Sequence, residues 1–284
     1  MFIWLASYPK SGNTLVRSLI TSYFFSRDGV YNYSLLKNIR QFPYIKLFED
    51  LGIDQKNERE VIANYIRVQQ SFNKKESTQF LKTHSYLFNI ENNAFTDLNN
   101  SLGVIYIVRD PRNVVTSFAN HNSISIEESA NYLIDRWSMG GNLNSFINSE
   151  RTKVYTGTWA GNYKSWKSFK FQGKYLLVKY EDLINKKEEV LLKMLKFIYK
   201  LNKKNFNVDK VKFKNAIDTT SFERMKASEK EDKFSENKID KKTGKKIPFF
   251  NLGKKNDWKK MLDPKIKEKI ENAFKEEMKE LEYL

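Results

Sequence analysis

Short apolar runs alternate with longer segments of helical periodicity along this chain. Runs rich in β-branched and aromatic residues cover residues 2–7, 79–83, 104–108 and 175–180. Apolar runs of this length are typical of strands that are buried on both faces, as in parallel sheets. Because helical patterns separate these runs, the sequence predicts an α/β fold, a three-layer sandwich in which helices cover both faces of a central parallel sheet.

Helical segments follow three of the strands directly and fill the intervals between the others. We expect helices to begin near the following residues: Asn13, Arg59, Pro111, Ile126, Thr158 and Glu181. A last helix should run from Pro264, a favoured first-turn residue, to the end of the chain. Residues 229–250 include a densely charged stretch, which predicts a mobile surface loop. With no internal repeat or linker, residues 1–284 are expected to form a single domain.

Composition excludes several kinds of chemistry. The 284 residues contain no cysteine, which rules out disulfides, cysteine nucleophiles and thiolate metal sites. Only two histidines are present, so a His-rich metal site is not expected and we predict that no metal is required. The apolar N-terminal run is too short for a signal peptide, and no run approaches the roughly 20 residues of a membrane span. We therefore expect a cytoplasmic protein without membrane insertion.

The charge balance favours an anionic partner without choosing one. The formal net charge is +16, and most of the basic side chains are lysines. Nucleic acid, a membrane surface or a phosphorylated small molecule would each suit this excess. A biased genomic composition would explain it equally well, so the choice depends on local motifs.

The first such motif joins a strand to a helix through a loop suited to anions, FIWLASYPKSGNTLVRSLI. The loop ends at a helix N-terminus, where backbone N–H groups and the helix dipole favour negative charge. Lys10, Ser11 and Thr14 add side-chain donors, and Gly12 permits close approach of a phosphate. The Walker A signature is not met, because Lys10 precedes the turn. An ordinary capped turn would also account for residues 11–14 on their own.

A second strand runs into a helix at GVIYIVRDPRNVVTSFANH. Arg109 ends the strand, and its guanidinium group is suited to bidentate phosphate binding. Asp110 is placed to cap the helix that Pro111 opens, and Ser117 follows about two turns later. Taken alone, Arg109 would be explained as well by a salt bridge at a strand end.

A third strand, in QFLKTHSY, ends at a candidate general base. Lys82 and His84 lie at its C-terminal end, where open α/β sheets form their ligand crevice. An imidazole can accept a proton near neutral pH, as transfer to an alcohol requires. A structural role for His84 is the alternative.

These motifs together resemble those of the sulfotransferases that use 3'-phosphoadenosine-5'-phosphosulfate (PAPS). SYPKSGNTL is similar to the family's 5'-phosphosulfate loop, TYPKSGTTW, and RDPRNVVTSFANH is similar to its 3'-phosphate signature, RDPRDVxVSxxxH. The KTH triplet matches as well. The resemblance implies a P-loop-like fold and sulfuryl transfer from PAPS to an acceptor hydroxyl or amine, with release of adenosine 3',5'-bisphosphate (PAP).

The resemblance also implies roles for individual residues. His84 would be the catalytic base, Lys82 would lie near the sulfuryl group, and Lys10 would neutralise the leaving phosphate. Cofactor contacts from the two phosphate motifs would come from Lys10, Ser11, Gly12, Asn13, Thr14, Leu15, Arg109 and Ser117. Arg112 and His121 would be structural or surface residues. Leu15 replaces a Trp of the family pattern, which removes one expected contact near the adenine.

Further matches continue towards the C-terminus. The segments TWAGNYKSW, VKYEDL, TTSFERMK and FFNLGKKNDWKK resemble the family's SWxxHVxSW, xxYEDL, TSFxxMK and RKGxxGDWK. They imply cofactor contacts from Tyr180, Thr220, Phe222, Gly253 and Lys254. In the last segment Asn251 and Leu252 replace Arg and Lys, and Asn256 replaces Gly. We therefore expect weaker cofactor binding or a remodelled loop.

Other interpretations remain at this point. A P-loop-like kinase or nucleotide hydrolase would share the strand, loop and helix but should carry the Walker A lysine. A basic nucleic-acid-binding protein would suit the charge, although no nucleic-acid motif is recognised and we expect no such partner. The predicted acceptor is a small molecule or a glycan, in a pocket walled by residues 31–70 and 122–155. The sequence gives no indication of the oligomeric state.

Overall fold

A five-stranded parallel sheet forms the centre of the protein in the computed structural model, which describes residues 1–74, 76–135, 138–139, 153–230, 238–239 and 243–284. Its strand order is β2-β3-β1-β6-β9, and all four neighbouring pairs are parallel. The strands are β1 (Phe2–Ser7), β2 (Arg40–Gln41), β3 (Gln79–Thr83), β6 (Ser101–Val108) and β9 (Tyr175–Lys179). The predicted α/β class is thereby confirmed.

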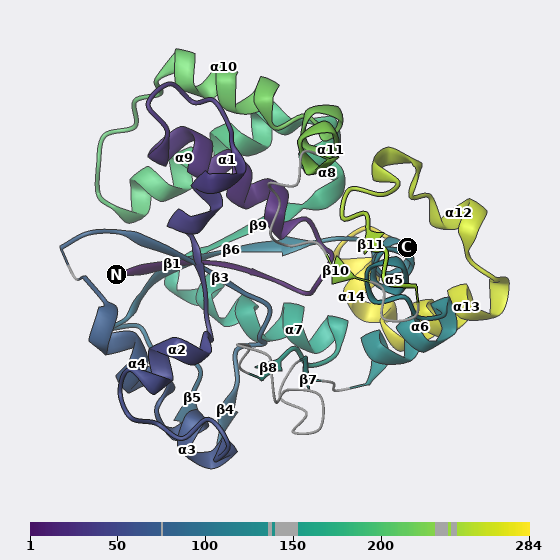
Figure 1. Ribbon diagram of the computed structural model, residues 1–284, viewed down its shortest axis with the longest axis horizontal. Helices are drawn as coiled ribbons and strands as arrows, with labels where there is room; N and C mark the ends of the chain where they lie inside the picture. Colours follow the sequence, from purple (N-terminus) through teal and green to yellow (C-terminus); the bar gives the residue numbers. More distant parts are fainter. Residues whose placement is uncertain (75, 136–137, 140–152, 231–237, 240–242) are drawn as a thin grey trace.

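Alternate residues of β1 enter two separate cores, which explains why this strand reads as continuously apolar. Phe2, Trp4 and Ala6 pack on one face of the sheet, whereas Ile3 and Leu5 pack on the other. Helices α1 (Asn13–Phe25), α9 (Lys187–Leu201) and α10 (Lys210–Thr219) cover the second face. The opposite face carries α7 (Trp159–Trp166), as Figure 1 shows, so the sandwich has the expected three layers.

The remaining elements surround this sandwich. Further helices are α2 (Ile45–Glu49), α3 (Glu58–Ala63), α4 (Tyr65–Phe72), α5 (Pro111–Asn122), α6 (Ile126–Ile134), α8 (Tyr180–Asn185), α11 (Phe222–Lys230), α12 (Trp258–Met261), α13 (Pro264–Ala273) and α14 (Lys275–Glu280). Short 3-10 helices are η1 (Tyr33–Asn38), η2 (Lys167–Gln172) and η3 (Gly253–Lys255). Antiparallel pairs join β4 (Asn89–Ile90) to β5 (Asn93–Ala94), β7 (Ser138–Met139) to β8 (Val154–Tyr155), and β10 (Lys238–Ile239) to β11 (Lys246–Ile247).

Three departures from the expected elements concern the central sheet and the C-terminal helices. Strand β6 begins at Ser101, earlier than the apolar run, where Ser101 pairs with Phe2 of β1 and its buried hydroxyl accepts a hydrogen bond from the Trp4 indole at 2.8 Å. The polar edge strand β2 has no apolar run to predict it. The last helix is divided at Phe274, whose non-helical backbone lets its ring pack against Trp159 at 5.1 Å.

The two ends of the charged stretch 229–250 lie together. The buried Glu229 carboxylate accepts hydrogen bonds from the backbone N–H groups of Phe249 and Phe250, at 2.6 and 2.9 Å. The mobile loop predicted there falls partly outside the described residues. Over the described parts of the chain, no helix is both long and apolar enough to cross a membrane.

Candidate active site

The predicted functional residues converge because four parallel strands end at the same edge of the sheet. Ala6 pairs with Thr83, and Ser7 pairs with Ile107. Val108 pairs with Lys179 in turn. His84, Arg109 and Tyr180 therefore all follow strand ends beside the loop that leaves β1. This carboxyl edge is where open α/β sheets bind their ligands.

The loop after β1 turns sharply into α1 and offers donors for an anion. Lys10 and Gly12 have left-handed backbones, with φ of 65° and 104°. Gly12, the N-cap residue of α1, makes no side-chain cap, and the partial positive charge of a helix N-terminus favours an anion there. The buried Ser11 hydroxyl also has no hydrogen-bond partner within the described part of the chain. The loop therefore fits a phosphate-like group.

The ring of Tyr180 lies directly against this loop. A Cβ atom at Gly12 would come within 2.5 Å of the Tyr180 ring, so only glycine fits there. The Arg109 guanidinium stacks on the same ring at 4.2 Å, and its Nη1 donates to the Lys10 carbonyl at 3.2 Å. The two anion motifs predicted from the sequence are thus in direct contact.

His84 is oriented by the end of β1. Its Nδ1 lies 2.9 Å from the Ser7 carbonyl oxygen and 3.2 Å from the Ser7 hydroxyl. Because a carbonyl oxygen only accepts hydrogen bonds, Nδ1 carries a proton, and in the neutral imidazole the lone pair is then on Nε2. Asn13 donates to the Leu5 carbonyl at 2.9 Å and to the Ser7 hydroxyl at 3.2 Å. The Asn13 side chain therefore supports the His84 contact from beneath the loop.

A second asparagine holds the main chain of His84. Asn162 is fully buried, and its amide nitrogen donates to the carbonyls of His84 and Thr156, at 2.9 and 2.7 Å. Its amide oxygen accepts from the Tyr106 hydroxyl at 2.8 Å. The sequence does not predict this role of Asn162, because His84 and Tyr106 lie far from it along the chain. Lys82 is half-buried on β3, where it pairs with Leu5 of β1.

The segment from Phe249 to Gly253 reaches the same loop. The Lys10 ammonium lies 3.9 Å from the centre of the Phe249 ring. A Cβ atom at Gly253 would come within 2.6 Å of the Phe222 ring, so this glycine packs against the ring predicted to line the nucleotide. Lys226 ties α11 to the segment by donating to the Asn251 carbonyl at 3.0 Å.

The following residues fasten this segment to α5. Asn256 donates to the Asn113 carbonyl at 2.9 Å and accepts from the Thr116 hydroxyl at 2.6 Å. The Trp258 N–H group donates to the Asn113 side chain at 3.0 Å. Asn256 replaces a glycine of the family pattern, so this chain has an anchor that a glycine could not provide.

The other predicted site residues are placed as follows. Thr14 is buried and Leu15 half-buried on α1, and Ser117 is half-buried on α5. The buried Thr220 hydroxyl donates to the Ala216 carbonyl within α10 at 2.6 Å. The Lys254 side chain lies outside the described residues.

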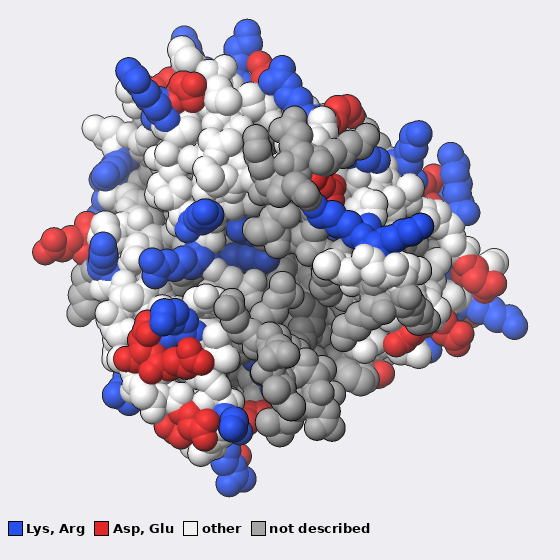
Figure 2. All heavy atoms as spheres, in the orientation of Figure 1, with Lys and Arg blue, Asp and Glu red and all other residues white. Residues whose placement is uncertain are grey.

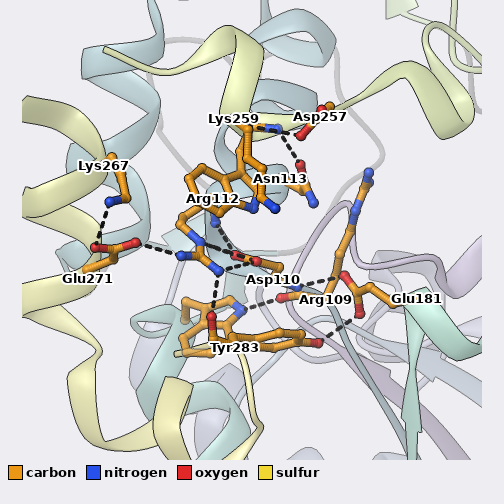
Figure 3. Close-up of polar contacts among 12 residues, drawn as sticks. Arg109, Asp110, Arg112, Asn113, Glu181, Asp257, Lys259, Lys267, Glu271 and Tyr283 are labelled. Carbon is orange, nitrogen blue, oxygen red and sulfur yellow. Dashed lines mark hydrogen bonds and ion pairs between the residues drawn. The ribbon is translucent and has the colours of Figure 1, made fainter. Parts of the chain in front are cut away.

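Arg112 has the structural role that the sequence analysis expected. Its buried guanidinium binds Asp110 at 2.7 Å and Glu271 at 2.6 Å, and it stacks on Trp258 at 3.9 Å (Figure 3). Asp110 caps α5 by accepting from the Arg112 N–H group. These contacts join the second anion motif to α13.

Two residues outside the predicted site, Trp159 and Glu181, support the main chain at Arg109. The Trp159 indole donates to the Arg109 carbonyl at 3.2 Å, and the Asp110 N–H group donates to Glu181 at 3.1 Å. Burial raises the pKa of Glu181. In the sequence, the position of Glu181 next to Tyr180 in the YEDL segment is the feature that could have indicated its role.

Positive charge is not confined to this site. Figure 2 shows Lys and Arg side chains spread over the visible face, with Asp and Glu side chains among them. By contrast, Arg109 is 7% exposed. The cations beside the candidate site are thus set apart by their burial rather than by a surface stripe.

Comparison with known proteins agrees with this geometry. Residues 2–282 match the family model described as a sulfotransferase domain. A luciferin sulfotransferase from Photinus pyralis is 24% identical over 267 residues, which cover 90% of this chain and 66% of that protein. An amine sulfotransferase from Oryctolagus cuniculus is 23% identical over 184 residues, which cover 64% of this chain and 56% of that protein. The match thus spans less than two thirds of each relative.

Similarity to a solved structure supports the fold. A crystal structure of mouse sulfotransferase SULT7A1 complexed with PAP aligns with a TM-score of 0.58 and 20% identity. The alignment covers 98% of this chain and 84% of that chain.

Gly12→Ala should destabilise the protein by more than backbone strain alone, because the new Cβ atom would overlap the Tyr180 ring. Gly173→Ala is the matched control, since Gly173 also has a positive φ but no other atom lies within 4 Å of the place its new methyl group would take. We expect Gly173→Ala to lower the free energy of unfolding by about 1 kcal/mol and Gly12→Ala by about 2–4 kcal/mol. Urea unfolding measures both, and equal losses would contradict the contact.

Proposed function

The chain belongs to the sulfotransferase-domain family, and from that premise we propose that it transfers a sulfuryl group from PAPS to a hydroxyl or amine acceptor, releasing PAP. One observation carries the proposal. Arg109 touches both the Lys10 carbonyl and the Tyr180 ring, so the two anion-binding motifs form one site. A nucleotide with phosphates at both its 5' and 3' positions suits such a pair.

We assign the nucleotide to the hydrogen-bond donors of the two motifs at this site. The 5' end would be held by the loop N–H groups with Lys10, Ser11 and Thr14, and Gly12 would allow close approach. The 3'-phosphate would be held by Arg109 and Ser117. The buried Nε of Arg109 has no hydrogen-bond partner among the described residues, which supports a role in binding an anion.

The remaining predicted contacts would surround the base of the nucleotide. Tyr180 and Phe222 offer aromatic faces for the adenine. Thr220, Gly253 and Lys254 complete the set taken from the family motifs, with Asn13 and Leu15 on the first loop. Asn13 would act by supporting Ser7 and the loop, because its amide group already donates to Leu5 and Ser7.

His84 would act as the general base. PAPS, when bound, supplies the sulfuryl group and a stable phosphate leaving group. The Ser7 carbonyl fixes the Nδ1 proton of His84, which leaves Nε2 to accept the proton of the acceptor hydroxyl or amine. Lys10 and Lys82 would stabilise the negative charge that develops on the leaving oxygen. Fixed charges of this kind need little rearrangement during the reaction.

We further propose a small-molecule acceptor. The Photinus and Oryctolagus relatives are named for luciferin and for amines, both small molecules. Lys153 binds Glu58 at 2.7 Å, which joins the two stretches expected to wall the acceptor pocket. The Tyr86 N–H group donates to the Tyr155 carbonyl at 2.8 Å, which joins the second stretch to the chain two residues after His84. Much of the second stretch lies outside the described residues.

We also propose that the chain forms a single domain. Residues on both faces of a single sheet form the main cores, and helices α13 and α14 pack into the same core as β1. We infer that residues 1–284 fold as one unit.

Arg109→Lys should weaken PAP binding by about tenfold or more, because lysine cannot form the bidentate contact of a guanidinium. Binding of adenosine 5'-monophosphate (AMP), which lacks the 3'-phosphate, should change by less than about twofold under the same reasoning. Isothermal titration calorimetry measures both affinities, with ATP and Mg²⁺ as the competing nucleotide. Tighter binding of ATP with Mg²⁺ than of PAP by the unaltered protein would contradict the proposed function.

His84→Ala should lower the sulfate-transfer rate by about 10²- to 10⁴-fold while leaving PAP affinity unchanged, since the imidazole acts on the acceptor proton. His121→Ala provides the control, because His121 is the other histidine and lies against the Phe249 ring. The assay is transfer of radiolabelled sulfate to phenol, alcohol and amine acceptors. Undiminished turnover in His84→Ala would remove His84 from the proposed mechanism.

A further inference from the structure

The peptide group between Arg109 and Asp110 is held on both of its edges. Trp159 donates to its carbonyl oxygen at 3.2 Å, and its N–H group donates to Oε1 of Glu181 at 3.1 Å. Figure 3 shows Glu181 beside this peptide at the end of the strand. Because the peptide fixes the direction of the Arg109 Cα–Cβ bond, these two contacts aim the guanidinium group.

Glu181 is itself fixed by Tyr283. The Tyr283 hydroxyl donates to Oε2 of Glu181 at 2.9 Å, so both carboxylate oxygens accept a hydrogen bond. Burial raises the pKa of Tyr283, as it does that of Glu181. Hydrogen bonds between desolvated groups are costly to lose, because the abandoned partner cannot turn to water.

Hydrogen bonds connect Tyr283 through Arg112 and Asp110 back to Glu181, so these four residues form a closed ring. Arg112 donates to the Tyr283 carbonyl at 2.7 Å and to Asp110 at 2.7 Å (Figure 3). Asp110 reaches Glu181 through its N–H group, and Glu181 reaches Tyr283. Tyr283 therefore supports both Asp110 and Glu181. Asp110 follows Arg109 in the sequence, and Glu181 follows Tyr180.

We propose that Tyr283 is a positioning residue for Arg109, and that through Glu181 it sets the preference of the site for a nucleotide with a 3'-phosphate. The inference rests on the proposed function, in which Arg109 binds that phosphate. A bidentate guanidinium contact is sensitive to small errors in its direction, whereas the 5' end is assigned to the loop after β1, which Arg109 touches at the Lys10 carbonyl. Loosening Glu181 should therefore weaken one end of the nucleotide selectively.

Tyr283→Phe tests the proposal, with PAP and AMP as the probes in calorimetric titrations. Removal of the hydroxyl should raise the Kd for PAP by about 5- to 20-fold, the range expected when a hydrogen bond to a charged group is lost in part. The Kd for AMP should change by less than about twofold, because AMP has no group for Arg109 to bind. The ratio of the two affinities separates positioning from a general loss of structure.

Tyr163→Phe is the matched control. The Tyr163 hydroxyl donates to Glu280 at 3.0 Å, so this variant also removes a tyrosine–glutamate hydrogen bond near α14. It should leave the PAP-to-AMP affinity ratio unchanged. The PAP-to-AMP affinity ratio of Glu181→Gln should lie between those of the unaltered protein and Glu181→Leu, because a glutamine oxygen can still accept from the Asp110 N–H group.

The possible results distinguish a failure of the role of Tyr283 from a failure of the proposed function. An unchanged PAP-to-AMP ratio in Tyr283→Phe, or an equal weakening of both nucleotides, would overturn the role of Tyr283. If the unaltered protein bound PAP no more tightly than AMP, the proposed 3'-phosphate site and the proposed function would fail instead. A selective loss for PAP in Tyr283→Phe, absent from Tyr163→Phe, would support both.

Discussion

The contact between the Tyr180 ring and the backbone of Gly12 is the constraint on which the site depends. It requires a residue without a side chain in the loop, and it joins the end of β9 to the loop after β1 across the intervening strand β6. Arg109 stacks on the same ring and donates to Lys10. One aromatic ring thus brings together residues from three strand ends, and the register of the sheet delivers each of them to that ring.

The fold could be predicted from the sequence because its determinants are local. Each long strand is buried on both faces, so β1 and β6 appear as apolar runs that need no knowledge of their neighbours. Strand β2 could not be predicted, because its pairing with β3 depends on the backbone and its side chains are polar. The motifs likewise predicted which strand ends would carry chemistry, and the structure places these ends together.

The supports of the site could not be predicted, because they join residues that are distant in the sequence. Asn162 holds His84 across 78 positions, and Tyr283 holds Glu181 across 102. Sequence motifs identify the residue that bears a charge or a proton, but not the buried amide or hydroxyl group that orients it. For Asn256 the sequence shows the departure from the family pattern, but it does not show the contacts to α5.

The position of Phe249 over Lys10 has an electrostatic consequence of its own. A π face 3.9 Å from the ammonium group keeps water from that side of the cation. With fewer solvent dipoles to screen it, the charge acts more strongly on an anion that approaches from another direction. An uncharged ring near the end of the chain thereby tunes the field of a lysine near its beginning, and exchange of that ring for an aliphatic side chain would alter the field without altering any formal charge.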